Sequence, residues 1–124
     1  MSDAFFGLTY VSTNVHSEAM ITQGVTGFEW DKGNRDKCQK HGVSVDALES
    51  AFHQTMAIFP DPAHSQDEER FIAIGKTGEG RSVFVAFTLR QKNGETFIRP
   101  ISVRYMHQKE VDYYEEAIAK ADDR

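Results

Sequence analysis

The chain has 124 residues, of which 40% are hydrophobic, 27% charged and 11% aromatic, and its formal net charge is −5. This composition suits one small globular domain and excludes an intrinsically disordered chain, while no apolar run approaches the roughly 20 residues of a membrane helix. Cys38 is the single cysteine, which excludes an internal disulfide and a cysteine-based metal knuckle, and the lack of a signal-peptide pattern leads us to expect the cytoplasm.

The first 26 residues differ from the rest of the chain. They are polar and contain one short alternating segment, residues 6–11, which would form either an edge strand or a loose tail. We therefore expect an N-terminal extension of unknown role over residues 1–26 and a single domain over residues 27–124. That domain opens with a short aromatic strand or turn at residues 28–31.

Two short helices are predicted next. Residues 33–40 form the first, which we expect to end near Gly42, a residue suited to the left-handed conformation found after many helices. Ser44 suits the N-cap of the second helix because its hydroxyl can accept a backbone hydrogen bond, and Leu48 and Phe52 then fall on one apolar face.

The apolar period then changes to two, which is typical of strands. Strands are predicted over residues 56–59, 70–74, 82–90 and 96–106, with Asn93-Gly94 as the turn between the last two, and a helix over residues 107–120. The fold class is therefore α+β: two N-terminal helices, an antiparallel meander of about four strands and a C-terminal helix. We expect the helices to pack on one face of the sheet.

The hairpin turn predicts which side chains share a face of the sheet. With Asn93-Gly94 as the loop, Arg90 lies opposite Phe97 and Thr88 lies opposite Arg99. Because partners across two strands point to the same side, the two arginines fall on one face.

Pro100 changes that pattern further along the strand. An unbroken register would bury Arg104 unpaired among apolar side chains, which is very unfavourable. Because proline cannot donate to the ladder, we predict a bulge at Pro100 that reverses the faces beyond it. The bulge turns one set of residues to the core, namely Ile101, Val103 and Tyr105, and places another set beside Arg90 and Arg99, namely Ser102 and Arg104.

Charge is spread unevenly along the chain. Residues 70–109 carry a net charge of +6, whereas residues 1–69 carry −7 and residues 110–124 carry −4. A basic middle section can bind a polyanion although the whole protein is acidic.

Several segments carry a family resemblance. They are Phe28-Glu29-Trp30-Asp31, Lys40-His41-Gly42-Val43-Ser44, Glu69 to Gly75, Phe87-Thr88-Leu89-Arg90, Arg99 to Arg104 and Tyr113-Tyr114-Glu115. In this order, across residues 28–118, the sequence resembles the BrnT family of toxins. Val103 departs from the alanine usual in the family, which affects packing rather than chemistry, and residues 1–26 have no counterpart.

The resemblance implies a RelE-like fold and a ribonuclease toxin of a type II toxin–antitoxin pair, acting on mRNA without a cofactor. It also implies a BrnA-like antitoxin as the inhibitor, with operator DNA bound only through the antitoxin and no contact with a membrane. The alternative from another class is a non-catalytic module of the same fold that works within an autorepressor complex.

Metal-independent RNA cleavage needs a proton acceptor, positive charge at the scissile phosphate and an acid for the leaving oxygen. Arg104 is the candidate for the phosphate, because a guanidinium matches two phosphate oxygens. The candidates for RNA binding are Arg90, Arg99, Ser102 and Arg70. Each arginine alone could also be an ordinary solvated strand residue.

Two more side chains are candidates for catalytic proton transfer. Glu69 could serve as a general base, or could pair with Arg70 or another basic neighbour. His107 directly follows the strand of Arg104, and imidazole suits proton transfer near neutral pH. The histidines show no zinc-type spacing, so we expect no metal site.

Overall fold

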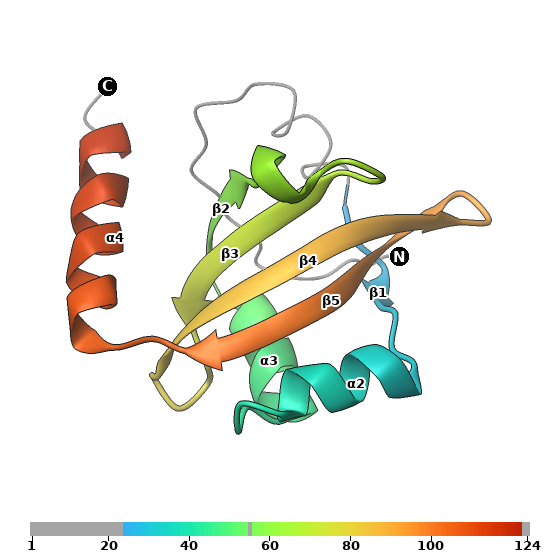
Figure 1. Cartoon of the computed structure of the whole chain (residues 1–124), viewed down its shortest axis with the longest axis horizontal. Coiled ribbons are helices and arrows are strands. Elements are labelled where there is room, and N and C mark those ends of the chain that lie inside the picture. The colour runs from blue at the N-terminus through green and yellow to red at the C-terminus, as the bar shows by residue number, and fades with distance from the viewer. Residues whose placement is uncertain (1–23, 55, 123–124) are drawn as a thin grey trace.

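The computed structural model describes residues 24–54 and 56–122, and it has the predicted α+β fold (Figure 1). The alternating segment expected at residues 6–11 lies outside the described residues. One curved sheet forms the centre, and its strands run in the order β1-β5-β4-β3-β2. The strands are β1 (Gly27–Phe28), β2 (Ala57–Pro60), β3 (Arg70–Lys76), β4 (Ser82–Lys92) and β5 (Glu95–Tyr105).

The sheet is mixed rather than purely antiparallel. The four long strands form the predicted antiparallel meander, with β4 paired on one side to β3 and on the other to β5. The fifth strand, β1, is parallel to β5, with Gly27 beside Phe97 and Phe28 beside Ile98. The segment predicted as a strand or turn therefore adds an edge to the sheet.

Both N-terminal helices begin at side-chain caps. In α2 (Lys32–Gln39), the Asp31 carboxylate accepts the backbone N–H of Asn34 at 2.9 Å, and the Asn34 amide oxygen accepts the backbone N–H of Asp31 at 2.8 Å. In α3 (Val45–Phe52), the hydroxyl of Ser44 accepts the backbone N–H of Ala47 at 3.0 Å, as predicted. Gly42 between the helices has the predicted positive φ, +83°.

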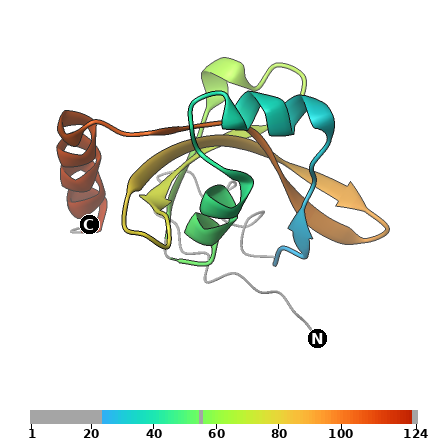
Figure 2. The same ribbon diagram turned by 90° about the horizontal axis from the view of Figure 1, so that it is seen from below.

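The core lies between α3 and one face of the sheet, and Cys38 of α2 joins it from the edge beside β5. Phe52 of α3 meets Phe28 and Phe87 edge-on, and Phe71 stacks on Phe87. Figure 2 shows α3 beneath the curved sheet. Leu48 is fully buried beside these rings, so the predicted apolar face of α3 is the one that packs.

The C-terminal helix departs from the prediction that all helices share one face. In α4 (Gln108–Asp122), Tyr114 contacts Phe84 and Phe59, both with ring centroids 6.3 Å away. Phe84 alternates along β4 with the buried core residues Val83 and Val85, so it points to the opposite side. Consequently α4 stands at the end of the sheet (Figure 1) and packs on the face that α3 leaves uncovered.

A register shift in β5 confirms the predicted bulge. Thr88 pairs with Arg99 and Phe87 with Pro100, but the next residue of β4, Ala86, pairs with Ser102. Ile101 is therefore the extra residue of the bulge. The prediction that Ile101 joins the core is wrong, because the unpaired residue of a bulge does not follow the alternation on either side.

Beyond the bulge, the predicted reversal of faces is confirmed. Val103 pairs with Val85 and is 1% exposed, and Tyr105 pairs with Val83 and packs against the core. No helix in the described part of the chain is long and apolar enough to span a membrane.

Candidate functional site

The sheet face opposite α3 gathers the predicted RNA-binding residues. We call it the arginine face and define it by the side chains of Arg70, Thr88, Arg90, Arg99, Ser102 and Arg104. Arg70, Thr88 and Arg99 form one row across three strands, because Thr88 is the register partner of both arginines. Strand register therefore places Arg90, Arg99 and Arg104 on one face, as the sequence predicted, and adds Arg70 to that face.

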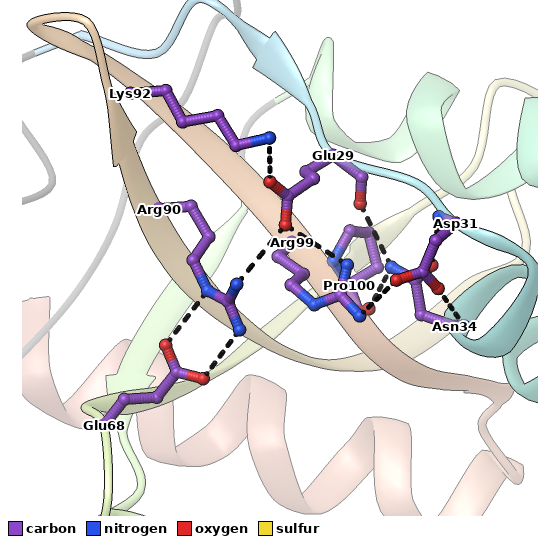
Figure 3. Close-up of polar contacts among 8 residues, drawn as sticks. All are labelled: Glu29, Asp31, Asn34, Glu68, Arg90, Lys92, Arg99 and Pro100. Atoms are coloured by element: carbon purple, nitrogen blue, oxygen red, sulfur yellow. Dashed lines mark hydrogen bonds and ion pairs between the residues drawn. The ribbon is translucent and has the colours of Figure 1, made fainter.

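Glu29 is the hub of a charged network at one end of this face (Figure 3). It follows β1, and its backbone N–H bonds to the carbonyl of Ile98, which holds the carboxylate over β5. One carboxylate oxygen lies 3.2 Å from Nη1 of Arg99 and 3.6 Å from Nη1 of Arg90, and the other oxygen pairs with Lys92. Three cations thus share one carboxylate that is only 15% exposed.

Two further carboxylates complete the network (Figure 3). Glu68 accepts hydrogen bonds from Nε and Nη2 of Arg90 at 3.2 and 3.1 Å. Asp31, the cap of α2, accepts one from Nη2 of Arg99 at 2.8 Å. The positive charge that the sequence places between residues 70 and 109 is therefore met by carboxylates from outside that stretch.

Ionisation of these groups is shifted in the direction that the pairing requires. Lys92, followed by Arg90 and Arg99, lowers the pKa of Glu29 against the opposing effect of burial. The pKa of Asp31 is lowered first by the backbone N–H of Asn34 and then by Arg99. Glu68 raises the pKa of Arg90, so every member of the network that is shifted favours its charged form.

Arg104 lies at the other end of the face and has a partner that the sequence did not reveal. Its Nη1 and Nη2 each donate to one oxygen of Glu110, both at 2.8 Å, in a two-pronged pair. The guanidinium also lies over the ring of Phe84, 4.6 Å from its centroid. Glu110 raises the pKa of Arg104, and Arg104 lowers the pKa of Glu110 to about 2.

His107 adjoins this pair. Its backbone N–H donates to Glu110 Oε1 at 3.1 Å, and its side chain is exposed. Glu110 is the third residue of α4 and therefore caps the helix that it begins. The available signal for Glu110 was its position three residues after His107, the residue before the helix. Histidine is not among the residues preferred at an N-cap, so this signal is weak.

Glu69 does not lie with these residues. It is exposed and directly precedes Arg70, whose row contains Thr88, whereas Arg104 pairs with Phe84. The two rows are four positions apart along β4, a distance of roughly 13 Å at about 3.3 Å per residue. Glu69 is therefore far from Arg104, and Ser102, half-buried opposite Ala86, lies between the two ends.

Asn34 anchors the bulge beneath the face and was also missed from the sequence. Its amide nitrogen donates to the carbonyls of Pro100 at 2.8 Å and Glu29 at 3.0 Å, and its side chain is buried. The sequence pattern shows only the capping position of Asn34. It does not show that the side chain also binds the carbonyls of Glu29 and Pro100, which lie far apart in the chain. Asn34 fixes Glu29 and the bulge relative to one another.

The described residues contain no group of three or more His, Cys, Asp or Glu side chains arranged to hold a metal ion. The sequence matches one family model across residues 30–110, about two thirds of the chain, and that family is described as the ribonuclease toxin, BrnT, of type II toxin–antitoxin systems. A comparison with curated proteins finds no match. The matched stretch runs from α2 to the first turn of α4 and includes Arg104 and Glu110.

Proposed function

Because the chain belongs to the BrnT family of ribonuclease toxins of type II toxin–antitoxin systems, we propose that it cleaves RNA on the arginine face. The proposed fold is RelE-like, as the family resemblance implies, and residues 27–124 form one domain. The substrate is mRNA, so the activity belongs to the cytoplasm.

The two-pronged pair of Arg104 and Glu110 is the observation that carries the proposal. Two parallel N–H groups held by a carboxylate present the geometry that also fits two phosphate oxygens. Arg104 is 41% exposed in its side chain and so can be reached from solvent. An RNA phosphate can therefore replace Glu110 on Arg104 without rearrangement of the strand.

In the proposed reaction, the ribose 2′-oxygen attacks the adjacent phosphorus and the bond from phosphorus to the 5′-oxygen breaks. The 2′-hydroxyl proton passes to a base, and the leaving 5′-oxygen takes a proton from an acid. Arg104 stabilises the negative charge that develops on the phosphoryl oxygens. The products are a cyclic 2′,3′-phosphate and a free 5′-hydroxyl, and no metal ion takes part.

His107 is the proposed group for one of these proton transfers. It lies beside the Arg104–Glu110 pair, whereas Glu69 stands at the far end of the face. Glu110 is a weak base while it is paired, because its pKa of about 2 leaves little affinity for a proton. Arg90, Arg99, Ser102 and Arg70 are proposed to position the RNA backbone and bases.

Substitution of Arg104 tests the proposal. Arg104→Ala is expected to lower the rate of RNA cleavage by about 10²–10³-fold, the usual loss for one donor to a transition state. Arg104→Lys should recover little, since a point charge does not reproduce the fork. The matched control is Arg81→Ala, because Arg81 also lies over an aromatic ring, that of Tyr105 at 3.5 Å. Tyr105 pairs with Val83 and packs against the core, on the side of the sheet opposite the arginine face.

Growth arrest on induction and cleavage of purified RNA are both measured, alongside thermal melting. Arg104→Ala that remains fully toxic contradicts the site. A second substrate carrying a single 2′-deoxy substitution at the cut position should resist cleavage, and addition of EDTA should not slow the wild-type chain. If the wild-type chain cleaves nothing but represses its operator with an antitoxin, the non-catalytic alternative is correct.

The proposed partner is a BrnA-like antitoxin that covers the arginine face and alone contacts operator DNA. Acidic groups of the antitoxin would replace Glu29, Glu68 or Glu110 on their arginines. Binding between these charges is screened by salt, so affinity measured by calorimetry should fall as salt rises. An affinity that stays constant from low to high salt would argue for an apolar interface instead.

A further inference from the structure

A small polar pocket opens on the arginine face beside the bulge. Its volume is about 250 Å³, slightly below the range of sites that hold whole small molecules. The residues that line it come from β3, β4, the bulge and the loop before β3, and they are His64, Gln66, Asp67, Glu68, Arg70, Thr88 and Ile101.

Two polar atoms at this pocket are buried and make no hydrogen bond. They are Nε of Arg70 and Oγ1 of Thr88, and Thr88 is only 2% exposed. The two residues are register partners on β3 and β4, so both side chains rise from the same point of the sheet. A buried polar group without a partner is costly, so a ligand that accepted a hydrogen bond from this pair would be stabilised there.

Arg70 is also distinct in its charge pairing. Arg90, Arg99 and Arg104 are each held by at least one carboxylate, whereas within residues 24–54 and 56–122 no ion pair of Arg70 is found. A ligand that enters the pocket therefore does not have to displace a carboxylate from the guanidinium of Arg70.

The rim shows which ligand fits. Two carboxylates, Asp67 and Glu68, line the same small space and would repel a phosphate group. His64 is held by Asp61, whose carboxylate oxygens lie 3.0 and 3.1 Å from Nδ1, and offers an aromatic ring for stacking. Donors at the floor, acceptors at the rim and an aromatic wall together complement the edges of a nucleobase.

We propose that this pocket selects one unstacked base of the RNA substrate, with guanine preferred. Guanine carries two neighbouring acceptors, O6 and N7, which suit an arginine, and an amino donor that suits a carboxylate. The bulge shapes the pocket, since the displaced Ile101 supplies its apolar wall. This inference rests on the proposed function, because it assigns a specificity subsite to the same RNA-binding face.

Binding of short single-stranded RNAs to the Arg104→Ala variant tests the inference without cleavage. The probes are hexauridylate and three hexamers in which one uridine is replaced by guanosine, adenosine or cytidine. The guanosine hexamer should bind about tenfold or more tightly than the others, the usual discrimination of one good base contact. Equal affinities for all four hexamers overturn the proposal.

Thr88→Val, made in the same background, separates a binding role from a structural one. It should remove most of the preference for guanosine yet leave the melting temperature unchanged or raised, because the hydroxyl that it deletes is buried without a partner. The matched control is Thr96→Val, where the hydroxyl donates to Gln91 at 3.1 Å. That change should lower the melting temperature and keep the base preference.

Arg70→Lys keeps the charge but loses the Nε donor, so it should also reduce the preference for guanosine. If Thr88→Val weakens the antitoxin complex and leaves base preference intact, the pocket serves a protein and the proposal is overturned. A different result would contradict the proposed ribonuclease activity without contradicting the base pocket. If the wild-type chain cuts no RNA while the hexamers are still discriminated, that activity is wrong and the base pocket stands.

Discussion

Arg104 and Glu110 hold each other through two hydrogen bonds of 2.8 Å, and the same Oε1 of Glu110 also accepts the backbone N–H of His107. One carboxylate thus serves an arginine of the sheet and the first turn of a helix. Its ionisation links the two elements.

Acid is expected to weaken that link in a defined range of pH. The pKa of Glu110 falls from an ordinary value of 4.5 to about 2 in the folded chain. The stability that comes from this shift is therefore complete above pH 4.5 and is lost as the pH falls towards 2. Thermal melting between pH 6 and pH 2.5 measures it, and Glu110→Gln should melt with a shallower dependence on pH across that range.

The lowered pKa values of Glu29 and Asp31 act in the same direction, so the Glu110→Gln variant keeps part of the acid sensitivity. Identical pH profiles for the wild-type chain and the variant would show that Glu110 is not linked to folding.

Asn34→Ala is expected to destabilise the fold by about 2–3 kcal/mol, because it leaves the carbonyls of Pro100 and Glu29 without their donor and removes half of the capping box of α2. Denaturation by urea measures the loss. Gln39→Ala is the control: the Gln39 side chain is exposed and donates to the carbonyl of Arg35 in the same helix at 3.4 Å. The stability of this variant should stay within about 0.5 kcal/mol of the wild type.

Gly75→Ala should destabilise the chain by about 1–3 kcal/mol through overpacking. A Cβ at this position would lie 2.8 Å from Cγ of the buried Met56. At Gly78 a Cβ would meet Ser50 at 3.6 Å, which is ordinary contact, so Gly78→Ala should be tolerated. Equal melting temperatures for the two variants would mean that Met56 moves aside at little cost.

Cys38 should be unreactive in the folded chain. Burial raises the pKa of its thiol to about 11, and the residue is 1% exposed, so little thiolate forms at pH 8. Labelling with a thiol reagent should therefore follow global unfolding and report on it without interference from another cysteine. Rapid labelling under native conditions would contradict the packing of α2 against the core.

The features predicted well from the sequence are those set by local chemistry. Ser44 caps α3, Asn93-Gly94 sets the register of the hairpin and Pro100 marks the bulge, since each depends on neighbours in the chain. That chain of inference also placed Arg90, Arg99 and Arg104 on one face. The hairpin register and the bulge at Pro100 were together sufficient for this result.

The features that were missed depend on contacts between distant segments. Two residues of β1 are too few to show a period, so the parallel edge was not foreseen. Glu29, Glu68 and Glu110 reach the arginines from loops or a helix, and strand register does not predict where such side chains go. The prediction for Ile101 failed because a bulge leaves one residue outside both patterns.

Because Arg104 and His107 share one oxygen of Glu110, binding at the arginine face is coupled to the start of α4. A ligand that takes Arg104 from Glu110 leaves the carboxylate bound to the start of α4 alone, so occupancy of the sheet changes the tether of the helix. A protein that binds α4 and moves Glu110 changes the affinity of Arg104 for that ligand. By thermodynamic linkage, the ligand changes the affinity of α4 for that protein by the same factor. The contacts at the start of α4 therefore depend on whether a ligand occupies Arg104.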